Sequence, residues 1–102
     1  MEDTLSRLVQ SLRCLPGVGP KSAQRMAYYL LNNKRQKGLH LAACLDEAMR
    51  RINHCNRCNN YTDASICSIC QNLNRNLNTL CIVEQPSDVS AIEQSGVYTG
   101  QY

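Results

Sequence analysis

The stretch that decides this fold is Cys55-Asn56-Arg57-Cys58, followed eight residues later by Cys67-Ser68-Ile69-Cys70. Each Cys-x2-Cys turn presents two thiolates to one side, so the two turns together can place four sulfurs tetrahedrally, about 2.3 Å from a zinc ion. Protein then fills every ligand position, which predicts one structural zinc ion and no open position for catalysis. Four-thiolate iron, an iron–sulfur cluster and disulfides are the alternatives, although two-residue gaps would strain a disulfide.

Two neighbours of the cluster and three isolated cysteines need their own interpretation. His54 is either a further ligand or, as we favour, a surface residue. Arg57 either offsets the negative charge that four thiolates leave around Zn²⁺, which we favour, or contacts a nucleic acid. The remaining cysteines lie in apolar helical or strand patterns and are expected to be small buried residues: Cys14, Cys44 and Cys81.

The composition explains why a metal is needed. The chain has 102 residues, of which 43% are hydrophobic, and it lacks Trp and Phe, so its core must be thin. Small domains of this kind often use a structural metal to complete their stability. No apolar run reaches about 18 residues and the first residues are acidic, which argues against a membrane span and a secretory signal. We therefore expect a cytoplasmic protein whose paired cysteines bind metal.

The residues before the cysteines predict three helices. Asp3 or Thr4 can cap the first, whose apolar face recurs at helical spacing: Leu5, Leu8, Val9 and Leu12. A turn with two glycines and two prolines follows at 15–20, and Pro20 suits the first position of a second helix. A polar, basic link at 32–38 precedes a third helix expected from about Leu39 to Ile52.

The glycine-rich turn has the features of a phosphate-binding hairpin. Gly17 and Gly19 permit positive φ angles and close backbone approach, and the turn leads to a helix N-terminus that attracts anions. Lys21 and Arg25 lie four residues apart, so they share one face above that terminus. Such a site grips a sugar–phosphate backbone and reads no base sequence. The alternative is an ordinary turn between two helices, and the spacing does not match a Walker loop.

Charge is unevenly distributed along the chain. Residues 1–54 carry nine Lys/Arg and four acidic residues, a net +5, whereas residues 55–102 carry a net −2. The N-terminal half is therefore the candidate polyanion-binding half, with an ordinary solvated basic surface as the alternative.

The last part of the chain predicts the beginning of an α/β layer. Leu80–Val83 reads as a buried strand, and 88–95 as a short helix that Ser87 caps and Gly96 ends. Residues 97–102 resemble the approach to a second strand that does not follow, so we expect either a fragment or a sheet that a partner completes. The predicted domains are 1–53, 54–78 and 79–102.

Three motifs, in order, resemble the RecR family of bacterial recombination proteins. Residues 15–25 resemble its helix–hairpin–helix, the four cysteines resemble its zinc finger, and residues 80–93 resemble the opening of its Toprim domain. The resemblance implies a mainly α fold: an N-terminal helix–hairpin–helix bundle, a small four-cysteine zinc knuckle, and the first strand and helix of an incomplete α/β Toprim domain. RecR chains are longer, and the later acidic Toprim residues and the C-terminal segment have no counterpart here.

The same resemblance implies a function. RecR proteins act with RecO and RecF in the bacterial cytoplasm, at the nucleoid, to promote recombinase loading on gapped or single-stranded DNA, and they form dimers and ring-like oligomers. Carried over by position, the residues that would bind DNA are Gly17, Gly19, Lys21 and Arg25. Glu84 matches the first acidic residue of the Toprim signature. Without partner acids, Glu84 is a poor Mg²⁺ site, so no enzyme is expected. The alternative is a zinc-stabilised dimerisation or assembly module with little DNA affinity.

Overall fold

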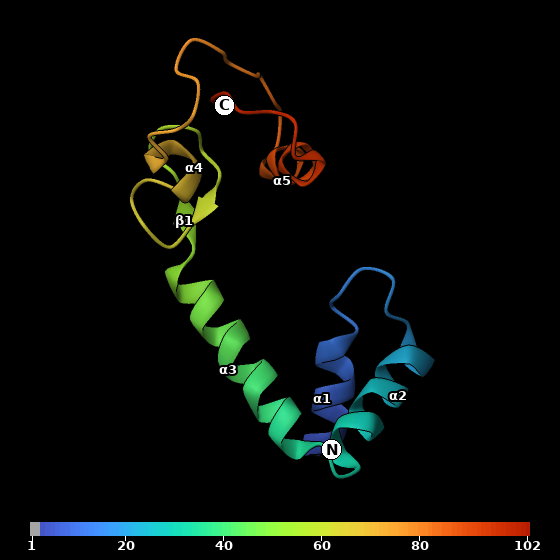
Figure 1. The fold of residues 1–102 in the computed structure, drawn as a ribbon. Helices are drawn as coiled ribbons and strands as arrows, with labels where there is room; N and C mark the ends of the chain where they lie inside the picture. Colours follow the sequence, from blue (N-terminus) through green and yellow to red (C-terminus); the bar gives the residue numbers. More distant parts are fainter. Residues whose placement is uncertain (1–2) are drawn as a thin grey trace. The chain divides into compact units, whose positions relative to one another are not determined.

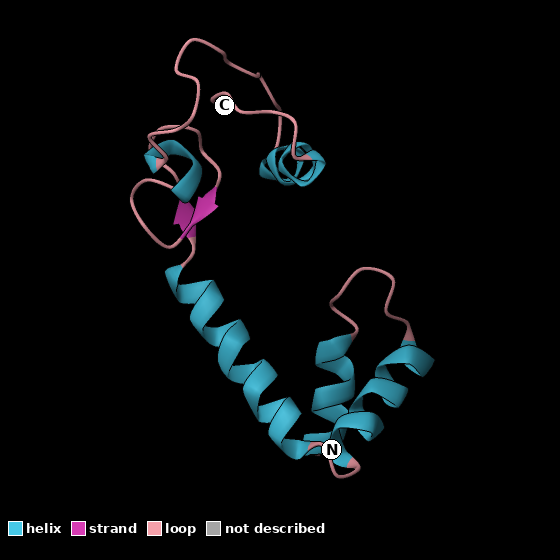
Figure 2. Ribbon diagram, in the orientation of Figure 1, coloured by secondary structure: helices cyan, strands magenta, loops and turns pink. Residues whose placement is uncertain are grey.

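The structure is a computed structural model that describes residues 3–102, and it is mainly helical (Figures 1 and 2). The predicted mainly α fold with a small cysteine module is confirmed. No described helix has the length and apolar character that crossing a membrane requires. Along the chain the elements are α1 (Thr4–Leu12), α2 (Pro20–Leu31), α3 (Arg35–Arg51), β1 (Asn53–His54), β2 (Tyr61–Thr62), α4 (Ser68–Gln71) and α5 (Pro86–Ser95).

The chain divides into two compact units, one ending at Glu47 and the other beginning at Ala48. In the first unit α1 and α2 pack against each other. Ala23 and Ala27 are fully buried and lie one turn apart on α2. Their small side chains let the two helices approach closely, which makes a tight but thin core. The predicted domain boundary at residue 78 remains a prediction.

Local signals account for two of the three helix starts. The Asp3 carboxylate accepts a 2.7 Å hydrogen bond from the Ser6 N–H and so caps α1, and Pro20 is the first residue of α2, both as predicted. The predicted start of the third helix was wrong: α3 begins at Arg35, not near Leu39, and Gly38 lies within the helix. The good helix formers Arg, Gln and Lys extend α3 backwards. A Cβ at Gly38 would lie 3.8 Å from the Leu30 side chain, an ordinary van der Waals distance, so packing against α2 does not require a glycine there.

The second unit begins with a minimal sheet. β1 and β2 pair antiparallel, with Asn53 opposite Thr62 and His54 opposite Tyr61. The buried cluster beside this sheet consists of Cys55, Cys67 and Cys70, and the partly buried Ile66 and Ile69 pack against it. Cysteine side chains therefore occupy the position that aliphatic residues hold in a larger domain.

The expected buried strand at Leu80–Val83 is not formed. Leu80 makes one isolated parallel bridge with Gln101, and Leu80 and Ile82 are 66% and 89% exposed. Strands are stable when several of them pair and bury one face, and residues 3–102 supply no further strand beside this one. The backbone here takes an extended path held by single hydrogen bonds, such as Cys81 N–H to the Gln101 carbonyl at 2.9 Å.

The helix after this segment is present, with a different cap from the one expected. Gln85, not Ser87, is the N-cap of α5, and it forms a capping box with Asp88. Val89 is buried, and Gly96 ends the helix with φ +74°, as predicted.

A network centred on Arg75 holds the C-terminal segment to α5. The Arg75 guanidinium makes a bidentate pair with Glu93, at 2.7 and 3.2 Å, and its Nε donates to the Gly100 carbonyl at 2.9 Å. The Tyr102 hydroxyl donates to the same Glu93 carboxylate at 2.7 Å. These bonds from Arg75 and Tyr102 hold the pKa of Glu93 below its ordinary 4.5, and burial together with the Glu93 carboxylate raises the pKa of Tyr102 to about 12. Sequence reasoning did not identify this network.

We predict that Glu93→Gln lowers the stability of this segment at neutral pH. Because the folded pKa of Glu93 is lowered, the ion pair stabilises the fold above pH 4.5, and this contribution is lost as pH falls through the folded pKa. The difference between variant and wild type should therefore shrink on acidification. Hydrogen exchange of the Cys81 and Gln101 amides measures it.

Glu84→Gln is the matched control, because Glu84 is an exposed acid of the same segment. A pH-independent difference between Glu93→Gln and wild type, or an equal effect of Glu84→Gln, would contradict the assignment.

Candidate metal centre and nucleic-acid interface

The four predicted metal ligands converge on one point. Their sulfur atoms all lie within 4.8 Å of one another, and Cys58 Sγ is 3.5 Å from Cys67 Sγ. Cys55 follows β1 directly, Cys67 precedes α4, and Cys70 lies within that helix. Three of the four residues are buried and Cys58 is half-buried. This donor set of four clustered thiols suits one tetrahedral zinc ion, with no place for a substrate.

Backbone hydrogen bonds shape the first knuckle around Cys55. Its N–H donates to the Asn60 carbonyl at 2.6 Å, and its carbonyl accepts from the Asn59 N–H at 2.9 Å. The N–H groups of Arg57 and Cys67 point at the Cys55 sulfur, at 3.4 and 3.3 Å. Donors directed at a sulfur stabilise its thiolate, which is the form that binds metal.

The thiols have divergent acidities as a result. Burial by itself would raise the pKa of Cys55, but N–H groups of Cys58, Cys67 and Arg57 offset it and lower that pKa to about 6. Burial raises the pKa of Cys58 and of Cys70. Four thiolates this close repel one another, so a divalent cation is what allows all four to ionise together, with release of protons on binding.

The residues flanking the cluster have structural roles. His54 lies outside the four-sulfur group: its Nδ1 is 2.9 Å from the Asn59 carbonyl oxygen and its ring packs on Tyr61. The Arg57 guanidinium donates to the Cys70 carbonyl at 3.5 Å and so lies beside the ligands, as the charge-offset interpretation requires.

The expectation that the other three cysteines are buried was wrong. Cys14 and Cys44 are exposed and Cys81 is half-buried. With so thin a core, an apolar position in the helical pattern does not ensure that another element covers it. Cys44 Sγ instead lies 3.5 Å from His40 Nε2 on the exposed side of α3.

The hairpin residues gather at the start of α2. Gly17 has φ +81°, a conformation that favours glycine, and the Val18 N–H donates back to the Leu15 carbonyl at 3.2 Å. Gly19 has φ −88°, so the positive φ expected for it is not used. Gly19 is the N-cap of α2 and offers no side-chain bond, and the first turn contains no acid. Lys21 and Arg25 are both exposed there.

The N-terminus of α2 is therefore open to an anion. The first backbone bond of the helix runs from the Ala23 N–H to the Gly19 carbonyl at 3.0 Å. The amides of Lys21 and Ser22 precede it and have no partner within the helix, and Pro20 has no N–H. Free amides, the helix dipole and two cations all favour negative charge at this end.

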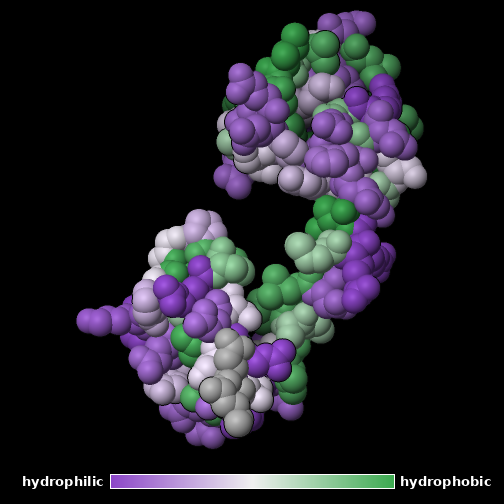
Figure 3. All heavy atoms as spheres, turned by 180° about the vertical axis from the view of Figure 1, so that it is seen from behind, coloured by the Kyte–Doolittle hydropathy of each residue, from purple (hydrophilic) through white to green (hydrophobic). Residues whose placement is uncertain are grey.

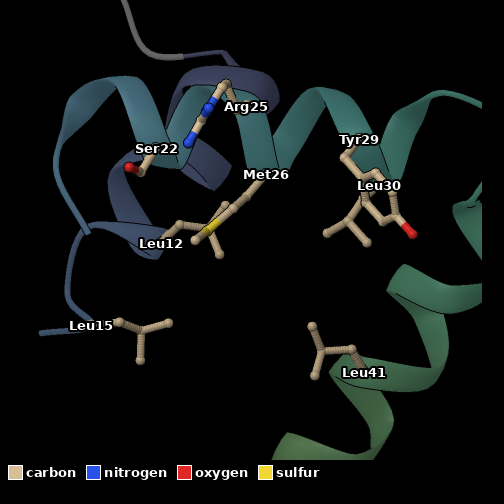
Figure 4. Close-up of a pocket in the computed structure, with 8 residues that line it drawn as sticks. All are labelled: Leu12, Leu15, Ser22, Arg25, Met26, Tyr29, Leu30 and Leu41. Atoms are coloured by element: carbon tan, nitrogen blue, oxygen red, sulfur yellow. The ribbon is translucent and has the colours of Figure 1, made fainter. Parts of the chain in front are cut away.

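A groove of about 480 Å³ adjoins the hairpin within the same unit (Figure 4). Ser22, Arg25 and Tyr29 of α2 line it together with five apolar side chains: Leu12, Leu15, Met26, Leu30 and Leu41. Sequence reasoning missed this groove. The signal was present in the apolar faces of the helices, whose leucines the packing leaves partly exposed, as at Leu15 and Leu41.

Glu84 is exposed, and its N–H donates to the Asp88 carboxylate at 3.3 Å in the cap of α5. Within residues 3–102, the four cysteines are the one group of three or more metal-ligating side chains that lie together. The structure thus brings the metal ligands together and gathers the hairpin residues, and it places Glu84 in a helix cap.

Comparison with known proteins agrees with this description. Residues 5–49 match the family described as "RecR, helix-hairpin-helix", and residues 52–72 match the four-cysteine zinc finger domain of RecR. The proteins named "Recombination protein RecR" from Legionella pneumophila strains Corby and Lens are 63% identical over 100 residues, which is 98% of this chain and 51% of theirs. The chain spans about half the length of these curated relatives.

The two family matches coincide with the hairpin and with the cysteine cluster that the structure places in its two units. The cysteine cluster is therefore a four-cysteine zinc finger that holds one zinc ion. The chain belongs to the RecR family of recombination proteins, whose helix–hairpin–helix and four-cysteine zinc finger it carries.

Proposed function

We propose that this chain binds DNA without sequence preference and serves recombinational repair, with the hairpin and the start of α2 holding the phosphate backbone. The observation that carries the proposal is the open N-terminus of α2, where a glycine cap, an acid-free first turn and two exposed cations occur together. In the proposed roles, Gly17 and Gly19 let the backbone approach a phosphate, and Lys21 and Arg25 neutralise it.

Binding of this kind depends on salt. Each phosphate contact displaces condensed counterions, so the logarithm of the affinity falls by roughly 0.9 per contact for each log unit of salt on duplex DNA, and by roughly 0.7 on single strands. Backbone contacts position a protein but carry no sequence information. This suits a repair factor that must act wherever damage occurs.

We further propose that the chain acts with RecO and RecF to promote recombinase loading on gapped or single-stranded DNA in the bacterial cytoplasm. Support comes from its 63% identity to RecR proteins over 98% of the chain. The same identity supports assembly into a homodimer or a ring-like oligomer. Residues 79–102 remain a predicted start of a Toprim domain.

We assign no catalysis to this chain. Glu84 participates in a helix cap, and among the described residues no cluster of acids lies around it that could hold Mg²⁺. The four-thiolate zinc site has every ligand position filled and leaves none for water. Metal-dependent cleavage of DNA by a purified sample would contradict this assignment.

A second candidate is an assembly module with little DNA affinity. The observation favouring it is the apolar surface of α3, where Leu39, Leu41 and Leu45 are 64%, 47% and 54% exposed. Figure 3 shows hydrophobic side chains, in green, exposed on the face of the molecule that it displays. Sedimentation measured alongside DNA binding separates the candidates, because self-association without DNA retention would favour the module.

The zinc ion has a structural role in this proposal. It replaces the aliphatic core in the segment from His54 to Asn78, where the buried residues are cysteines. The α1–α2 core of Ala23 and Ala27 lies in the other unit, so we expect that unit to fold without zinc. DNA binding through the hairpin should then depend on zinc indirectly.

We predict that Lys21→Glu combined with Arg25→Glu abolishes DNA retention at physiological salt while helix content stays constant. Loss of two phosphate contacts should also reduce the slope of log affinity against log salt by about 1.4–1.8. Gel-shift titrations over a salt series measure both effects, and circular dichroism reports the fold.

The matched control for charge is Arg7→Glu compared with Lys21→Glu. Both substitutions change the net charge equally, and Arg7 is an exposed residue of α1 outside the hairpin. If Arg7→Glu and Lys21→Glu weaken DNA binding equally, the effect is one of net charge and not of the hairpin. Unchanged DNA binding by the double variant would refute the hairpin assignment.

We predict that Cys70→Ser loses the zinc ion and loosens residues 54–78 first. Three thiolates hold zinc less well than four, and apparent binding free energies of structural zinc sites are about 10–16 kcal/mol, so the segment loses its main stabilisation. Native mass spectrometry measures the zinc content, and residue-resolved hydrogen exchange locates the loosening. Cys14→Ser, at an exposed cysteine outside the cluster, should retain zinc and fold. Unfolding of residues 3–47 in Cys70→Ser would show that the helical unit depends on the metal.

A further inference from the structure

Along α2, an exposed aromatic residue follows the two cations of the hairpin. Tyr29 follows Arg25 by four residues, so the two side chains are neighbours on the helix surface. Tyr29 is 52% exposed, and Lys34 Nζ lies over its ring, 5.2 Å from the centroid. The ring thus has one cation over it, Lys34, and a second cation, Arg25, about one helical turn away on the hairpin side.

The groove beside Tyr29 is lined by apolar side chains and one cation. Arg25 and Tyr29 line it with Ser22 and leucine and methionine side chains, and no acidic residue is among these lining residues (Figure 4). An occupant of this groove should therefore combine a flat apolar surface with negative charge. Nucleobases linked by phosphates combine both properties.

We propose that Tyr29 is a stacking platform for an unpaired base, with the phosphates on either side held by Arg25 and Lys34. The site then takes single-stranded nucleic acid in preference to duplex, because a paired base is already stacked and its faces are inaccessible. This inference rests on the proposed DNA binding and adds to it the residue that contacts an unpaired base.

The length of α2 suits a nucleic-acid strand of several nucleotides. The 12 residues of α2 rise about 18 Å, which is long enough for a short run of nucleotides to lie along the helix. Base–aromatic stacking does not depend on base identity, because every base has an apolar face. The proposed site therefore remains non-specific in sequence.

The chain contains its own matched control. Tyr28 is the adjacent residue of the same helix and is 51% exposed, yet it borders a different hollow, where the Gln24 amide donates to its hydroxyl at 3.4 Å. Tyr28→Ala and Tyr29→Ala remove the same ring from the same helix. Tyr29→Phe keeps a stacking ring and removes the hydroxyl.

The experiment measures affinity of the full chain for three probes at fixed salt: oligothymidylate, an abasic sugar–phosphate strand of the same length, and duplex DNA. Wild type should prefer oligothymidylate. Tyr29→Ala should bind it about tenfold or more weakly, while its affinity for the abasic strand stays constant. Tyr28→Ala and Tyr29→Phe should behave as wild type, and circular dichroism confirms that each variant is folded.

Several results would overturn the proposal. Equal affinity of wild type for the abasic strand and oligothymidylate would do so, as would equal effects of Tyr29→Ala and Tyr28→Ala. A change in sedimentation of Tyr29→Ala with unchanged DNA affinity would assign the groove to a protein partner instead. If any of these results occurs but Lys21→Glu/Arg25→Glu still loses DNA binding, the Tyr29 proposal is wrong and the proposed DNA binding is still supported. Unchanged binding in that double variant would instead refute the proposed function itself.

Discussion

Repulsion among four close thiolates, and its relief by a cation, is the constraint on which the segment around the cysteines depends. The sulfurs lie within 4.8 Å of one another, and cysteines are the buried residues of that segment. Ile66 and Ile69 add partly buried surface that is too small to fold a chain by itself. Zinc therefore supplies what apolar burial supplies in a larger domain, and it leaves the surrounding side chains free to be polar.

The helical unit is also small, and close packing of two helices stabilises it instead of a metal ion. Ala23 and Ala27 let α1 and α2 pack closely, and this close packing leaves larger apolar side chains at the surface. Gly17 turns the chain with a positive φ, and Pro20 starts α2 without an amide to satisfy. The same local chemistry that ends one helix and begins the next thus creates a helix terminus open to anions. The proposed binding site is therefore a consequence of the turn that joins α1 and α2.

Sequence patterns succeeded where structure is set by neighbours along the chain. The Asp3 cap, Pro20 at the start of α2, and Gly96 at the end of α5 all follow from local hydrogen bonding and backbone geometry. Sequence patterns failed where an element needs a partner that is distant along the chain. Leu80 to Val83 is β-prone but finds no sheet among the described residues, so the backbone is extended and exposed there.

By itself, the sequence determined the metal site and the hairpin, because ligand spacing and glycine or proline geometry act over a few residues. Tertiary structure alone decided three other features. They are the groove beside Tyr29, the exposure of Cys14 and Cys44, and the pairing of Arg75 with Glu93 across 18 residues. Each of these depends on which surfaces remain uncovered, or which side chains meet, once the helices have packed. A periodic pattern states which face of an element is apolar, and the packing of the whole chain decides whether anything covers it.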